Sequence, residues 1–95
     1  MLEHQDDLNI KVKQSGMNFS EALYYIKRMF AVRRAGWNGK GMWLEMSEYD
    51  IGTMYKEFPL LPHILIKTAD DFYVPWLASQ NDLLAEDWEL LHKID

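Results

Sequence analysis

The stretch "RRAGWNGKGMW" (Arg33–Trp43) places an Asn-Gly pair between two runs of alternating polar and apolar residues. Asn-Gly between such runs is a strong signal for a two-stranded hairpin, because both residues tolerate the positive φ of a tight turn. We therefore predict a strand over 31–36, a turn over 37–41 and a strand over 42–47. In the second strand, alternation puts Leu44 on one face and its neighbours Trp43 and Glu45 on the other.

A helix is predicted directly before this hairpin. Asn18 is a favourable N-cap residue, and Glu21 three positions later completes a capping-box pair. We expect a helix over about Phe19 to Met29, with its apolar face packed on a sheet. The apolar residues at helical spacing are Phe19, Ala22, Leu23, Ile26 and Phe30.

After the hairpin, residues 48–62 show no regular alternation and are predicted to form a loop. Strands are expected over 63–68 and 72–77, separated by a turn. Pro75 has no N–H to donate, so the second of these strands is expected at an edge of the sheet.

The C-terminal part of the chain is predicted to form a short helical turn and a last strand. Ser79 or Asn81 caps the turn, and the strand covers 87–92. Together these elements predict an α+β fold: one N-terminal helix packed on an antiparallel sheet of about five strands, with a short helical turn before the last strand. Residues 1–16 are predicted to be a flexible N-terminal extension, and residues 17–95 a single α+β ligand-binding domain.

The composition limits the class of protein. A length of 95 residues predicts one domain, and the lack of cysteine excludes disulfides and favours a reducing cytoplasm. No apolar run approaches the roughly 18 residues that a membrane span needs, and the net charge of −5 argues against a binder of DNA or RNA. A domain of this size has little room for a deep cavity, so a ligand pocket is expected between copies of the chain.

The charged residues are unevenly distributed. Between Glu21 and Glu45 every charged residue is basic, whereas residues 82–95 are mainly acidic. The basic segment is suited to one small anion, while a long polyanion would be repelled elsewhere. An alternative interpretation is that the basic and acidic segments are solvated faces that attract each other across a dimer.

Catalytic and metal-binding patterns are largely missing from the sequence. The three histidines, His4, His63 and His92, are too widely separated for a typical ligand motif. The run "GWNGKG" is too short for a P-loop, and no Ser or Thr follows its lysine. Glu86 and Asp87 would point to opposite faces of a strand, so they form no obvious acid–base pair. We therefore expect no catalysis, no metal and no cofactor.

The opening stretch has the residue types of a site for an anionic ligand that carries an aromatic ring. Its glycines let backbone N–H groups approach a phosphate, Arg34 and Lys40 supply charge, and Trp37 offers a stacking face. Strand alternation points Arg33 away from Arg34, so at most one of the two arginines reaches the ligand. The alternative is structural, with Trp37 in the core and the arginines paired with carboxylates.

A second stretch, "YVPWLASQNDLLAEDW" (Tyr73–Trp88), contains further residue types that suit such a ligand. Trp76 is a candidate stacking platform, and the polar residues after it are able to read ribose hydroxyls and a base edge; they are Ser79, Gln80, Asn81 and Asp82. Asp82 is suited to a vicinal diol. The alternative is an ordinary polar loop that caps a short helix.

In this order, the helix, "VRRAGWNGKGMWL" and "LPHILIKTADDFYVPWLASQNDLLAEDWELL" resemble a family of small phage and prophage proteins long filed as a domain of unknown function. The best-known members of this family are the second type of Thoeris anti-defence protein. The resemblance covers about residues 17–91. Neither the loop over 48–61, which interrupts this range, nor the N-terminal extension contains a motif that contributes to the resemblance.

The resemblance implies a non-catalytic sponge that binds and sequesters a cyclic ADP-ribose isomer, the immune signal made by a TIR-domain enzyme, in the host bacterial cytoplasm. It also implies a homotetramer with pockets between subunits and, in some members, cyclic dinucleotides at a separate site. Residue chemistry then assigns the phosphates to the basic and glycine residues, stacking to the two tryptophans, and hydrogen bonding to the rest. The expected ligand-binding residues are Arg34, Trp37, Asn38, Gly39, Lys40, Trp76, Ser79, Gln80 and Asp82.

Two other functions stay open from the residues. One is an enzyme that cleaves a cyclic nucleotide, although the sequence shows neither a metal cluster nor a positioned base that would support this activity. The other is a phage protein–protein interaction module that uses Trp43 and Trp76 as anchors.

Overall fold

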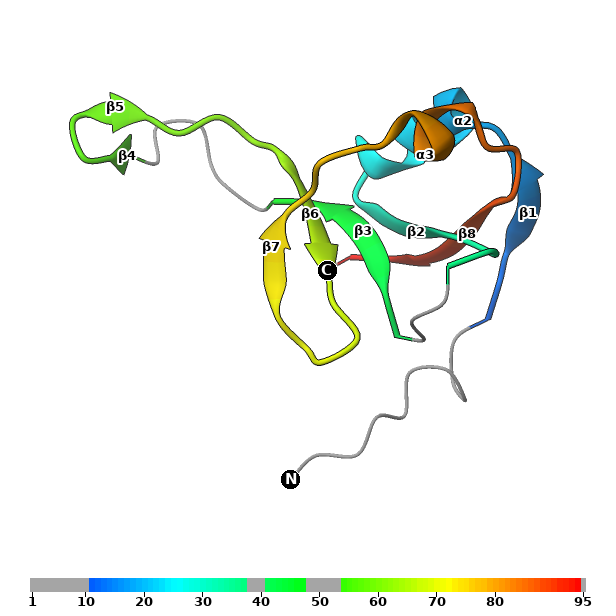
Figure 1. Cartoon of the computed structure of the whole chain (residues 1–95). Helices are drawn as coiled ribbons and strands as arrows, with labels where there is room; N and C mark the ends of the chain where they lie inside the picture. The colour runs from blue at the N-terminus through cyan, green and yellow to red at the C-terminus, as the bar shows by residue number, and fades with distance from the viewer. Residues whose placement is uncertain (1–10, 38–40, 48–53, 95) are drawn as a thin grey trace.

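Two short helices cover one face of a six-stranded antiparallel sheet, and a small hairpin stands apart from it (Figure 1). This computed structural model describes residues 11–37, 41–47 and 54–94. The strands are β1 (Gln14–Met17), β2 (Phe30–Arg34), β3 (Trp43–Met46), β4 (Met54–Tyr55), β5 (Phe58–Pro59), β6 (Ile64–Lys67), β7 (Tyr73–Pro75) and β8 (Trp88–Lys93), and the helices are α2 (Phe19–Ile26) and α3 (Gln80–Leu84). The large sheet has the order β1-β8-β2-β3-β6-β7, and β4 pairs with β5 in the hairpin.

Helix α2 begins with the capping box that the sequence predicted. The Asn18 side chain accepts a hydrogen bond from the Glu21 N–H at 2.9 Å, and the Glu21 side chain accepts one from the Asn18 N–H at 3.0 Å. The helix ends at Ile26, earlier than the expected end at Met29. The reason is the turn into β2, in which Met29 takes a φ of 69° and donates its N–H to the Ile26 carbonyl.

The core lies between α2 and the sheet face that α2 covers. Strand pairing puts Val32 opposite Leu44, and Leu44 opposite Ile66, so these side chains share that face. Trp43 and Glu45 lie on the other face, as the alternation predicted. The buried cluster consists of Met17, Ala22, Ile26, Val32, Leu44, Trp88 and Leu90.

The structure contains more strands than the five that we expected. β1 starts at Gln14, within the segment assigned to the N-terminal extension, and Met17 pairs with Trp88 at the sheet edge. The hairpin β4–β5 falls in the segment predicted to be a loop, over 48–62. The predicted helical turn is the five-residue helix α3, so the fold has two short helices on a mostly antiparallel sheet.

The basic and acidic segments meet within one chain, because β2 and β8 are neighbours in the sheet. Arg33 Nε lies 2.9 Å from a Glu89 carboxylate oxygen, and Arg34 Nε lies 2.9 Å from an Asp87 carboxylate oxygen. The expected attraction between these segments therefore acts across two strands of one copy.

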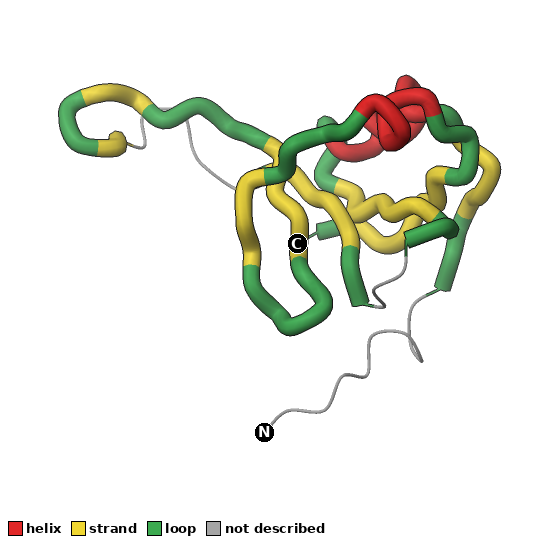
Figure 2. Tube along the Cα trace, in the orientation of Figure 1, coloured by secondary structure: helices red, strands yellow, loops and turns green. Residues whose placement is uncertain are grey.

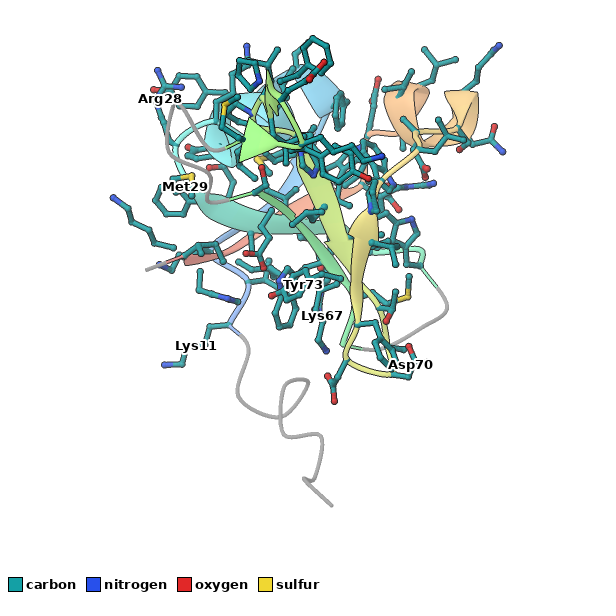
Figure 3. The ribbon with its side chains drawn as sticks, turned by 90° about the vertical axis from the view of Figure 1, so that its left-hand side faces the viewer. Lys11, Arg28, Met29, Lys67, Asp70 and Tyr73 are labelled. Atoms are coloured by element: carbon teal, nitrogen blue, oxygen red, sulfur yellow. The ribbon has the colours of Figure 1, made fainter. Side chains whose placement is uncertain are left out.

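The face of the sheet opposite α2 carries a buried polar cluster. The Trp43 indole N–H and the Tyr73 hydroxyl both donate to the same Glu45 carboxylate oxygen at 2.7 Å. Lys67 pairs with Tyr73 across β6 and β7, and the two side chains lie close together (Figure 3). Lys67 donates to the Gly41 carbonyl at 2.7 Å. Glu45 and Lys67 are only 6% and 5% exposed, and these hydrogen bonds satisfy their polar atoms inside the protein.

Candidate functional site

Arg34 is the centre of a hydrogen-bond network that joins β2 to the C-terminal part of the chain. Its Nε donates to Asp87 Oδ1 at 2.9 Å, and its Nη1 donates to Asp82 Oδ1 at 3.0 Å. The other Asp87 oxygen accepts the Gly36 N–H at 2.9 Å. Arg34 pairs with Trp88 in the sheet and therefore faces the side that the helices cover. The network ties the end of β2 to both α3 and β8.

The network shifts the pKa values of all three charged groups. The hydrogen bond from Arg34 lowers the pKa of Asp87, with burial opposing it and the Gly36 N–H adding to it. Burial acts to raise the pKa of Asp82, but hydrogen bonds from Arg34, Ser79 and Trp37 together lower it below its usual value. Hydrogen bonds to Asp87 and Asp82 raise the pKa of Arg34. All three groups are therefore charged at neutral pH.

Asp82 also holds the start of α3. Ser79 is the N-cap of this helix, and its hydroxyl accepts the Asp82 N–H at 3.1 Å, while Asp82 Oδ2 accepts the Ser79 N–H at 3.3 Å. The Trp37 indole N–H donates to Asp82 Oδ1 at 3.4 Å, and the Trp88 indole N–H donates to the Asp82 carbonyl at 3.0 Å. One carboxylate thus fixes the helix start, an arginine and a tryptophan together.

Trp88 forms the base of an aromatic cluster beside this network. It is fully buried, and the Trp37 and Trp76 rings meet it edge to face, with centroid distances of 5.5 and 6.2 Å. Phe19 of α2 packs against Trp88 at 5.3 Å and against Trp76 at 5.8 Å. Trp37 and Trp76 are half-buried, so each keeps part of its ring surface open.

The structure brings together most of the predicted site residues that it describes. Arg34, Trp37, Trp76 and Asp82 gather around Trp88 through the contacts above. Ser79 and Gln80 lie at the start of α3, and Gln80 is exposed. Asn38, Gly39 and Lys40 fall outside the described residues.

Two residues of the candidate site were not predicted from the sequence. Asp87 links Arg34 to the Gly36 N–H, and Trp88 supports the two half-buried rings of Trp37 and Trp76. A signal for Asp87 was present: it lies in the acidic segment over 82–95, opposite in charge to the basic segment that contains Arg34. No local signal in the sequence marked Trp88, because its partners come from three distant segments.

The described residues of the site offer aromatic faces and hydrogen-bond donors to a ligand. The positive charge of Arg34, however, is already neutralised by Asp82 and Asp87. The two bonds to carboxylates use two of the five N–H donors of the Arg34 guanidinium, so other donors remain for a ligand oxygen. Among the described residues there is no group of three or more His, Asp or Glu side chains that could hold a metal ion. Within those same ranges, no helix has the length and apolar character needed to cross a membrane.

Comparison with known proteins assigns the chain to a family. Residues 17–91 match the Tad2-like family, described as the Thoeris anti-defense 2-like domain. The chain is also 40% identical to a protein named Thoeris anti-defense 2 from Bacillus phage SP01, over 79% of this chain and 94% of that protein. The family match spans the hairpin strand with Arg34 and the α3 segment with Asp82. The chain therefore belongs to the Tad2-like family of Thoeris anti-defence proteins.

Proposed function

We propose that this protein is a non-catalytic sponge that binds a cyclic ADP-ribose isomer and so inhibits bacterial anti-phage defence in the host cytoplasm. The observation that carries the proposal is the convergence of Arg34, Trp37, Trp76 and the start of α3 around one buried tryptophan. Membership of an anti-defence family supports the biological role.

The chemistry of such a ligand matches the residue types of the site. The two half-buried indoles are suited to stacking on adenine, and stacking contributes roughly 1–3 kcal/mol per base. Free donors of Arg34, with Lys40 and the amide of Gly39, are suited to the pyrophosphate. Charge-assisted hydrogen bonds contribute roughly 1.5–3 kcal/mol each. A few contacts of each kind reach the ~12 kcal/mol of a nanomolar complex after the costs of binding.

The charge balance around Arg34 indicates which residue in our proposal binds the phosphates. Asp82 and Asp87 carry one more negative charge than Arg34 neutralises, so Lys40 is the main source of charge for the phosphates in this proposal. Asn38, Ser79, Gln80 and Asp82 are the proposed partners of the ribose hydroxyls and the base edge. We further propose a homotetramer with these sites between subunits.

The first test asks whether the ligand is bound without being changed. Cyclic ADP-ribose isomers, and cyclic dinucleotides as a second panel, are mixed with the protein, and the free and heat-released nucleotides are analysed by mass. A sponge removes its ligand from solution and returns it intact. Recovery of a linear or hydrolysed product would instead establish an enzyme, and no binding of any nucleotide would leave an interaction module.

The second test places the site. Trp37→Ala and Trp76→Ala each remove a proposed stacking face, and we expect each to weaken binding by about 5- to 150-fold in calorimetric titration. Trp43→Ala is the matched control, because Trp43 lies on the opposite face of the sheet, and it should stay within about twofold of the wild type. If the first two variants remain folded and bind as tightly as the control, the ligand binds elsewhere.

A further inference from the structure

Asp87 is the more accessible of the two carboxylates that bind Arg34. Its side chain is 35% exposed, whereas that of Asp82 is 15% exposed. The Oδ1 atom of Asp82 accepts N–H groups from both Arg34 and Trp37, and its Oδ2 atom accepts the Ser79 N–H. A carboxylate oxygen accepts about two hydrogen bonds, and each Asp87 oxygen accepts one in the bonds described above. Asp87 therefore keeps acceptor capacity where solvent reaches it.

The lack of a side chain at Gly36 leaves Asp87 and Arg34 open to a ligand. The end of β2 and the residues that lead into β8 lie side by side (Figure 2), and the Ala35 N–H donates to the Asp87 carbonyl at 2.9 Å. A Cβ atom at position 36 would lie 3.0 Å from Asp87 Oδ2 and 3.9 Å from Arg34 Nη2. The first distance is shorter than an ordinary van der Waals contact, so a larger residue would press on the carboxylate. Gly36 thus leaves room for a ligand to approach a hydrogen-bond acceptor and a donor together.

The charges of this group of residues favour a neutral ligand atom over an acidic one. Asp82 and Asp87 contribute two negative charges and Arg34 one positive charge, which leaves a net charge of −1. A hydroxyl group accepts a hydrogen bond from Arg34 Nη2 and donates one to Asp87 Oδ2 at the same time. An ionised phosphate oxygen has no proton to donate, so it would meet Asp87 as a like charge at contact distance.

We propose that Asp87 and the Nη2 group of Arg34 form a recognition pair that binds a hydroxyl of the adenosine ribose and rejects ligands phosphorylated at that hydroxyl. The proposal rests on the proposed function, which supplies a ribose-containing ligand. Trp37, a proposed stacking face for adenine, directly follows Gly36, so the ribose attached to that adenine lies nearest to the pair. The second N–H of Nη1 stays available to the pyrophosphate, because Asp82 takes only one of the two. Dinucleotide-binding enzymes discriminate in a similar way, with an acidic residue for a free ribose 2′-hydroxyl and an arginine for a 2′-phosphate.

Calorimetric titration with matched ligands tests the recognition pair. The probes are cyclic ADP-ribose isomers that carry a hydroxyl, a hydrogen or a phosphate at a free 2′ or 3′ position of the adenosine ribose. At one of these positions we expect the wild type to bind the hydroxyl form roughly 10- to 150-fold more tightly than the hydrogen form, because the hydrogen bonds are made to charged groups. The phosphate form should bind most weakly. Equal affinities at both positions would overturn the recognition pair and leave the sponge intact.

Asp87→Asn separates recognition from a purely structural role. This variant keeps an oxygen for the Gly36 N–H and removes one negative charge beside Arg34. We expect the phosphate form to gain roughly tenfold in affinity and to overtake the hydrogen form, because Arg34 then meets the phosphate without a like charge beside it. Glu86→Gln removes a charge from the exposed neighbouring position and should keep the wild-type order of the three forms. An equal loss of affinity for all three forms in Asp87→Asn would contradict the proposal.

Gly36→Ala tests the approach to the recognition pair without changing a charge. The added methyl group would crowd Asp87 Oδ2 and cover Arg34 Nη2, so we expect the hydroxyl form to lose its advantage over the hydrogen form. The hydrogen form should bind this variant as it binds the wild type. Full retention of the advantage would overturn the proposal. A wild type that binds no cyclic ADP-ribose isomer in any of the three forms would refute the sponge, and the recognition pair with it.

Discussion

Arg34 shows how one side chain joins distant parts of a small protein. Its two carboxylate partners lie about fifty residues later in the chain, one at the start of α3 and one just before β8. The arginine was proposed as a candidate site residue from its neighbours in sequence. Its partners were not, because the pairing depends on β8 lying beside β2.

The Arg34 network should make the stability of the protein depend on acid pH. The folded state lowers the pKa of Asp82 and Asp87 below the ordinary value of 3.8. A lowered pKa means that the stabilisation is complete above that value and is lost as the pH falls below it. We therefore expect the unfolding free energy, measured by urea denaturation from pH 7 to pH 3, to fall on the acid side of about pH 4.

Replacing one carboxylate tests this explanation. Asp82→Asn removes the ion pair with Arg34 and keeps an oxygen for the helix start, so we expect a loss of about 1–3 kcal/mol at pH 7 and a smaller loss between pH 4 and pH 3. The control is Glu86→Gln, at an exposed position between the two aspartates. An acid profile of Asp82→Asn that matches the wild type would assign the acid sensitivity to other groups.

At the scale of elements, the features set by local chemistry were predictable and those set by distant pairing were not. The capping boxes at Asn18 and Ser79 each involve residues three apart, so the sequence contained both partners. The β4–β5 hairpin was missed because Pro59 and the lack of alternation hide a two-residue strand. β1 was missed because only its pairing with β8 defines it as a strand.

The N-cap of α3 is expected to contribute to the stability of the protein and to ligand binding, although the helix has only five residues. Ser79→Ala removes the hydroxyl that accepts the Asp82 N–H, and a lost N-cap typically costs about 1 kcal/mol. We expect that loss in urea denaturation, together with weaker nucleotide binding, because Ser79 is itself a proposed ligand partner and its hydroxyl is one of the groups that hold Asp82 in place. Ser20→Ala on the exposed side of α2 is the matched control and should be neutral or slightly stabilising. Equal stabilities for the two variants would show that the capping box of α3 contributes little.

At the scale of the whole molecule, the two ends of the chain complete one sheet. β8, the last strand, lies between β1 near the start of the chain and β2. Met17 of β1 is 1% exposed and belongs to the core with Trp88. The fold class was predictable from the order of elements, whereas this closure was not, because it joins residues more than seventy positions apart.

A truncation at the predicted domain boundary tests the importance of this closure. Deleting residues 1–16 removes most of β1 and its pairing with Leu90, and we expect a loss of about 2–4 kcal/mol in the free energy of unfolding. Deleting residues 1–10 keeps the whole of β1 and should leave the stability near that of the full chain. If both deletions behave alike, β1 is dispensable and the domain begins at Met17.

The gathering of indoles around Trp88 has an optical consequence. Of the four tryptophans of the chain, Trp37 and Trp76 have ring centroids 5.5 and 6.2 Å from that of Trp88, and Trp43 lies on the other side of the sheet beside His92. Rings this close exchange excitation energy, so the ultraviolet emission and near-ultraviolet dichroism of the protein report mainly on one corner of the molecule. The unlabelled chain thus carries its own spectroscopic probe at the proposed ligand site, and we expect binding there to change the tryptophan emission.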